Sequence, residues 1–189
     1  MNLMAAVRKL LGRGELPPGF PGRLDADEAV LATARLAGGG HLVVTSRGLW
    51  LPEGSDAVRR LGWHLVSKAS WQNGALALVE AREREVLSGA VLLEDLPVQR
   101  LRLAEPGKVP EVVHARVTGS IRSRHHRELP GSADALSAGA PRGGAWFVQR
   151  KVAGRDGIVL QVRPDPGTDD AAVRQVAGDV ARTLGLRPE

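Results

Sequence analysis

The chain has 189 residues, of which 43% are hydrophobic and 25% are charged. This balance is typical of a globular protein that buries one core, or one core with an appended unit, and excludes a largely disordered chain. Cysteine is absent, which excludes disulfides, thiolate nucleophiles and cysteine-ligated zinc. The formal net charge of +5 is unevenly spread, because residues 98–163 carry 12 Lys and Arg against 5 Asp and Glu.

The first 26 residues are expected to form a short amphipathic helix followed by a linker. Leu3, Val7 and Leu10 recur at helical spacing, and prolines then interrupt the segment Gly14–Gly22. A signal-peptide pattern is not found at the N-terminus, and no apolar stretch reaches the roughly 18 residues of a membrane span. We therefore expect a cytoplasmic protein.

From Asp27 onward the chain alternates between apolar and polar residues as β-strands do. The predicted strands are Ala29–Leu36, His41–Thr45, Gly48–Leu51, Trp63–Trp71, Ala75–Ala81 and Arg100–Leu103. Asn73 and Gly74 form a two-residue hairpin signal. The tryptophans Trp50, Trp63 and Trp71 are expected to build the core of this sheet rather than a ligand pocket.

The runs HLVVTSRGLWL, GWHLVSKASW and GALALVEA resemble bacterial pleckstrin-homology-like (PH-like) domains. The resemblance covers residues 27–121 and rests on alternation and on Thr45, Arg47, Leu49, Trp63 and Leu76. It implies a bent antiparallel sandwich or barrel of seven strands, closed by a C-terminal helix. The turn Ser46-Arg47-Gly48 departs from the acidic or polar residue and two basic residues expected there, so binding of phosphoinositide-type head groups is not implied.

The segment 110–121 fits two structures. Pro110 suits the first position of a helix, and Val113, Val117 and Ile121 then repeat every four residues. The same stretch also alternates as a strand does. We favour the helix, because it completes the sandwich.

Residues 122–189 are predicted to form a β-β-β-α unit packed on the first domain. Its strands are Ser123–Leu129, Ala145–Val152 and Gly157–Val162, with a loop over Pro130–Gly144 and a final helix over Asp170–Leu184. The overall prediction is a β-rich α+β protein with an N-terminal segment 1–26 and domains 27–121 and 122–189.

The stretch His114–Arg127 contains four arginines, three histidines and no acidic residue. It is either a charged edge strand, which discourages aggregation, or a surface that binds anions. The residues of the anion-binding interpretation are Arg116, Arg122, Arg124, His125, His126 and Arg127. Proteins that read RNA add exposed aromatic side chains, whereas Trp146 and Phe147 are expected to lie in the core.

Other chemistry is not indicated. His125 and His126 are neighbours on a predicted strand and so point to opposite faces, which argues against a shared metal ion. We find neither a nucleophile elbow nor a phosphate-binding loop. The sequence therefore predicts no catalytic residue, metal or small-molecule cofactor, and favours a binding or scaffolding module. Such a module would contact a protein partner, or a second copy of itself, through a sheet edge or a helix; the alternative partner is nucleic acid or acidic lipid.

Overall fold

The computed structural model describes residues 14–54, 56–131, 143–155 and 157–186. Their contacts divide the chain into two compact units. Unit 1 contains Met1–Glu80 and Pro97–Gly119, and unit 2 contains Ala81–Leu96 and Ser120–Glu189. The predicted domains, residues 27–121 and 122–189, remain a prediction, because the two units are defined only by contacts within the chain.

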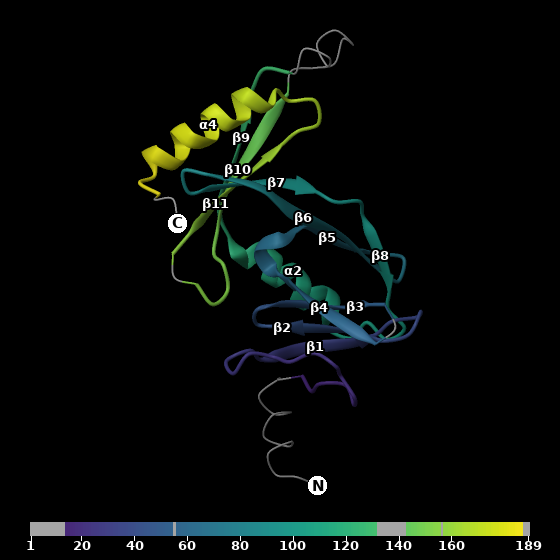
Figure 1. The fold of residues 1–189 in the computed structure, drawn as a ribbon. Helices are drawn as coiled ribbons and strands as arrows, with labels where there is room; N and C mark the ends of the chain where they lie inside the picture. Colours follow the sequence, from purple (N-terminus) through teal and green to yellow (C-terminus); the bar gives the residue numbers. More distant parts are fainter. Residues whose placement is uncertain (1–13, 55, 132–142, 156, 187–189) are drawn as a thin grey trace. The chain divides into compact units, whose positions relative to one another are not determined.

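Unit 1 contains two antiparallel groups of strands and a helix (Figure 1). The first sheet has the order β1-β2-β3-β4, and the second group pairs β6 with β5 on one side and β8 on the other. The elements are β1 (Val30–Arg35), β2 (His41–Thr45), β3 (Gly48–Glu53), β4 (Ala57–Gly62), β5 (Val66–Gln72), β6 (Ala75–Leu87), β8 (Gln99–Arg102) and α2 (Val109–Ser120). A single bridge between Leu36 and Leu103 joins the two groups at one corner.

The core of unit 1 comes from the inward side chains of these strands. Leu42, Val44, Leu49 and Leu76 are at most 1% exposed and form one cluster with buried residues of α2. Alternation at period two places such residues on one face of a sheet, which then has to be covered. The valines of α2 supply part of that cover, so the helix expected over 110–121 is confirmed at Val109–Ser120.

The outer face of the first sheet has its own small cluster. Val30, Val43 and Trp50 are buried there against Phe20 and Leu24 of the preceding irregular segment. The rings of Phe20 and Trp50 meet edge to face, with centroids 5.7 Å apart. The proline-rich segment 14–24 therefore packs onto the sheet it precedes.

Three details of unit 1 differ from the sequence expectation. Residues Trp63–Leu65 form a 3-10 turn, and β5 begins only at Val66. Trp63 is buried as expected, but Trp71 is 37% exposed, so its assignment to the core was wrong. Val66, the first residue of β5, is fully buried and defines which face of the strand points inward. Trp63 lies outside the strand, so its burial does not predict the face on which Trp71 lies. Strand β4 was also missed, because Arg59 and Arg60 interrupt its apolar alternation.

Unit 2 contains a mixed sheet and one helix. The sheet order is β6-β7-β11-β10-β9, in which β7 and β11 are parallel and the other pairs are antiparallel. The elements are the second half of β6, β7 (Ala90–Asp95), β9 (Ile121–Glu128), β10 (Gly144–Arg150), β11 (Val159–Pro164) and α4 (Asp170–Thr183). The predicted hairpin of residues 145–162 and the final helix are confirmed, whereas β7 and the extension of β6 to Leu87 were not foreseen.

The core of unit 2 lies between α4 and one face of this sheet. Val173, Ala177 and Ala181 are fully buried in one cluster with Leu92 and Val162 of the sheet. These helical positions repeat every four residues, as an apolar stripe requires.

Both ends of α4 carry the signals expected of helix termini. The Asp169 side chain caps the helix by accepting a hydrogen bond from the N–H of Ala172 at 2.7 Å. Gly185 follows the helix with φ +66°, the left-handed conformation in which glycine is favoured.

The structure thus shows a β-rich α+β protein. The expected helix within residues 1–13 and most of the expected loop of residues 130–144 lie outside the described residues. No helix in the described ranges has the length and apolar character needed to cross a membrane.

Candidate functional site

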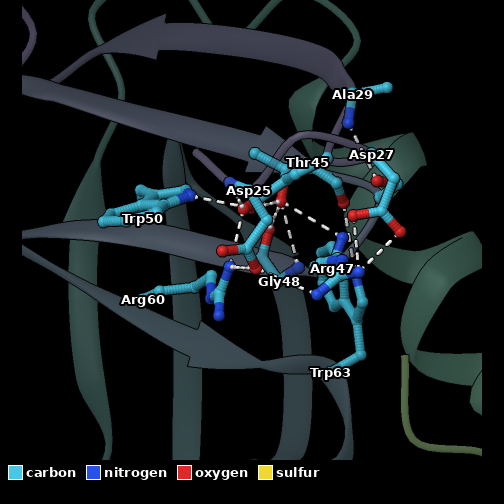
Figure 2. Close-up of polar contacts among 11 residues, drawn as sticks. Asp25, Asp27, Ala29, Thr45, Arg47, Gly48, Trp50, Arg60 and Trp63 are labelled. Carbon is cyan, nitrogen blue, oxygen red and sulfur yellow. Dashed lines mark hydrogen bonds and ion pairs between the residues drawn. The ribbon is translucent and has the colours of Figure 1, made fainter. Parts of the chain in front are cut away.

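A buried carboxylate organises a hydrogen-bond network in unit 1 (Figure 2). The Glu28 side chain is fully buried and accepts hydrogen bonds from Thr45 Oγ1 at 2.5 Å and Trp50 Nε1 at 2.9 Å. Arg60 Nη1 donates to its second oxygen at 2.6 Å. A buried carboxylate is tolerated only when it is paired and hydrogen-bonded, and here three side-chain donors satisfy it.

The electrostatics of this network favour the charged form. Burial raises the pKa of the Glu28 carboxyl, but hydrogen bonds from Thr45 and Trp50, among others, outweigh burial and hold the pKa below its ordinary value. The hydrogen bond from Arg60 likewise lowers the pKa of Asp25. A carboxylate held in this state is a poor general acid or base at neutral pH. We therefore interpret the network as structural.

The same network fixes the turn between β2 and β3. Thr45 Oγ1 accepts hydrogen bonds from the N–H groups of Arg47 at 3.2 Å and Gly48 at 3.1 Å. The Arg47 guanidinium binds Asp25 at 2.9 Å and Asp27 at 2.5 Å. Because two carboxylates neutralise this arginine, the turn presents little net positive charge to an anionic ligand.

The second candidate is β9 in unit 2, which is an edge strand. Among the described strands, β9 pairs only with β10. Five of its consecutive side chains are exposed: Arg124, His125, His126, Arg127 and Glu128. An edge strand carries unpaired main-chain donors and acceptors, and can therefore accept another strand.

The register identifies which main-chain groups point away from the sheet. The N–H of Leu129 donates to the carbonyl of Gly143 at 3.0 Å, so this opposite pair is hydrogen-bonded. Hydrogen-bonded and non-hydrogen-bonded pairs alternate in an antiparallel ladder. It follows from the register of β9 against β10 that Arg124, His126 and Glu128 direct their N–H and C=O groups outward.

An aromatic side chain lies beside this edge on β10. Trp146 is opposite His126 in the register, and the two ring centroids are 5.0 Å apart. The Arg124 guanidinium lies 5.5 Å from the Trp146 ring centroid. Trp146 is 36% exposed, so its assignment to the core was wrong, whereas Phe147 is buried as expected. His126 Nε2 also lies 2.7 Å from Asp165 Oδ2.

The predicted anion-binding residues do not all belong to one element. Arg116 is exposed on α2 in unit 1, whereas the other five lie on β9 in unit 2. Along β9, Arg124 and His126 share the face of Trp146, while His125 and Arg127 point to the opposite face. Their cations therefore flank the strand on both sides. Sequence reasoning missed Asp165 as the partner of His126, since 39 residues separate them.

A polar cleft of about 420 Å³ lies in unit 2, at the loop that precedes α4. Its carboxylates are held in ion pairs: Asp170 with Arg84 at 3.0 Å and Asp95 with Arg163 at 3.1 Å. The hydrogen bond from Arg84 lowers the pKa of Asp170. Such paired charges stabilise the loop and do not indicate a particular reaction.

Comparison with known proteins gives no further guidance on the site. Neither a family model, nor a curated protein, nor a solved structure matches the chain. Within the residues that the structure describes, no group of three or more His, Asp or Glu side chains is arranged to hold a metal ion.

Proposed function

We propose that the protein is a non-enzymatic binding module that takes up an extended segment of a protein partner along the edge of β9. One observation carries this function: β9 is an edge strand whose outward main-chain groups belong to the exposed residues Arg124, His126 and Glu128. Strand addition draws its affinity from such main-chain hydrogen bonds. The absence of cysteine is in keeping with a role in the cytoplasm.

We further propose that unit 1 is a PH-like scaffold. Unit 1 contains four strands (β1–β4), three further strands (β5, β6 and β8) and a closing helix in this chain order, with Ala81–Leu96 of unit 2, including β7, inserted before β8. This order supports the resemblance of residues 27–121. Domains of this kind present edges and loops to partners, and the fold by itself does not select the ligand. The neutralised Arg47 argues against head-group recognition at the β2–β3 turn.

The second candidate function is binding of a polyanion through Arg116, Arg122, Arg124, His125, His126 and Arg127. It is favoured by the partly exposed Trp146 beside Arg124, because aromatic rings next to cations stack the bases of single-stranded nucleic acid. Strand addition fits the geometry better. The cations of β9 alternate between two faces, which matches an added strand but divides the positive charge available to a phosphate backbone.

The decisive experiment compares His126→Ala with His126→Pro. Both variants lose the imidazole, but only proline also loses the outward N–H, and proline is tolerated where an edge N–H faces solvent. We expect short extended peptides of Val and Thr, measured by fluorescence polarisation, to bind the alanine variant. The proline variant should bind them about 5- to 100-fold more weakly, as expected for an acceptor left unpaired.

The fold is checked with a matched substitution at the neighbouring residue. The N–H of His125 points toward β10, so His125→Pro should lower the melting temperature of the protein, whereas His126→Ala and His126→Pro should melt alike. Equal peptide affinity for His126→Ala and His126→Pro would show that β9 does not accept a strand. Failure of every extended peptide to bind would reject the function as well.

A further inference from the structure

The charges of β9 narrow the partner to one chemical class. Within the described part of the chain, neither Arg124 nor Arg127 forms an ion pair. The Arg124 guanidinium lies over the Trp146 ring. Glu128 is the only acidic residue of the strand. Two arginines without a carboxylate partner favour a segment that brings negative charge to the same positions.

A second copy of this edge is a less complete match than an acidic segment. Residues opposite one another share a face, so two β9 strands paired antiparallel about His126 would place Arg124 opposite Glu128 but Arg127 opposite His125. Paired about His125, they would place Arg124 opposite His126 and Arg127 opposite Ser123. In both registers Arg127 has no carboxylate opposite it, whereas an acidic segment supplies one to each arginine.

Resting on the proposed function, we propose that the occupant is an acidic extended segment of a partner protein whose two carboxylates are three residues apart. This spacing follows from the positions of Arg124 and Arg127, and it holds for parallel and antiparallel addition alike. One carboxylate would face Arg124 on the Trp146 side of the sheet, and the other would face Arg127 on the opposite side.

The register adds a second feature to the segment. Glu128 is next to Arg127, so the residue that lies opposite Glu128 has to be neutral or basic. The segment is therefore acidic at spaced positions and is not a continuous run of carboxylates. This distinguishes it from a uniform polyanion, in which every position carries the same charge.

Peptide binding tests the charge of the segment and the spacing of its two carboxylates. We would compare a Val/Thr peptide that carries two glutamates three residues apart with the same peptide carrying glutamines, and with one carrying lysines. The glutamate peptide is expected to bind about 2- to 30-fold more tightly than the glutamine peptide, and the lysine peptide to bind least tightly. Moving the glutamates to a spacing of four residues should remove most of the advantage, because a glutamate opposite Arg124 then places the other opposite Glu128 or beyond the strand.

A charge exchange shows whether the effect is local to β9. The double variant Arg124→Glu with Arg127→Glu should reverse the preference and bind the lysine peptide more tightly than the glutamate peptide. Arg100→Glu with Arg102→Glu is the matched control. It changes the net charge equally on the exposed strand β8 and should leave the preference for glutamate unchanged.

The outcomes separate this inference from the function on which it rests. If all peptides bind equally and His126→Pro weakens all of them, strand addition stands and the acidic partner is rejected. If no peptide binds, both are rejected. Tighter binding of a single-stranded DNA homopolymer or of vesicles containing phosphatidylserine, unaffected by His126→Pro, would assign the surface to polyanions and overturn the inference. An equal loss of glutamate preference in the β8 control would overturn it too.

Discussion

The Glu28 network allows a sharp test of what stabilises unit 1. In Glu28→Ala, Thr45 Oγ1 can still donate to the Gly48 carbonyl at 3.0 Å, and Arg60 keeps Asp25 at 2.7 Å. The indole N–H of Trp50 has no such alternative, because the Trp50 residue is only 8% exposed. The substitution therefore lowers stability mainly because the buried indole N–H of Trp50 is left without a hydrogen-bond acceptor.

The loss in free energy of unfolding can be estimated from this single unpaired donor. An unsatisfied buried donor costs about 1–3 kcal/mol, and the loss of the packed side chain adds to it. Trp50→Phe removes the donor itself, so Glu28→Ala should cost less in the Trp50→Phe background than in the wild type. We expect a coupling energy of about 1–3 kcal/mol between the two residues.

The coupling energy is obtained from urea unfolding of the wild type, Glu28→Ala, Trp50→Phe and the double variant. Unfolding is followed by far-UV circular dichroism. The Trp50→Phe change also loses ring contact with Phe20, but that loss occurs in both arms of the cycle and cancels. If the Glu28→Ala substitution costs the same free energy of unfolding in both backgrounds, the hydrogen bond between Glu28 and Trp50 does not contribute to stability and the interpretation of the network is wrong.

Three further predictions concern the titration of Glu28, the N-cap of α4 and two glycines. Because the pKa of Glu28 is lowered from 4.5, its ionised form stabilises the fold above that pH, and the stability difference between the wild type and Glu28→Gln should narrow in thermal melts as the pH falls below 4.5. Asp169→Ala removes the N-cap of α4 and should cost about 0.5–2 kcal/mol in denaturant unfolding; no measurable cost would contradict the capping role. Gly48→Ala should lower the free energy of unfolding, since its Cβ would lie only 2.3 Å from the carbonyl oxygen of Leu61. Gly119→Ala is the matched control on helix α2: its Cβ meets no atom within 4 Å, so the substitution should be neutral or slightly stabilising in the same assay.

Period-two alternation alone was enough to place most of the strands. His41–Thr45 was predicted with its observed bounds, and Leu42 and Val44 are fully buried. The same rule, applied to Ala145-Trp146-Phe147, would have placed Trp146 on the face opposite its two buried neighbours. The preference of tryptophan for the core was given more weight than alternation, and the exposed aromatic beside β9 was missed for that reason.

The helices were predictable because their signals are local. Asp169, the stripe of Val173 and Ala177, and Gly185 specify the beginning, the buried face and the end of α4 within one short segment. Strand β4 lacks such a signal. Its Arg59 is bound to Glu80, a residue on β6, and the sequence gives no indication of a partner so far along the chain.

Local patterns specify the class of the fold, most strand and helix positions and the location of the cationic stretch, since alternation, capping and charge act between residues that are near one another. Packing of the folded chain sets which strand is an edge and which face each cation of β9 occupies. It also brings Asp25 and Asp27 to Arg47, and Asp165 to His126. Those properties depend on strand order, register and contacts across 20 to 39 residues. Such contacts form only when the chain has folded, and no local pattern encodes them.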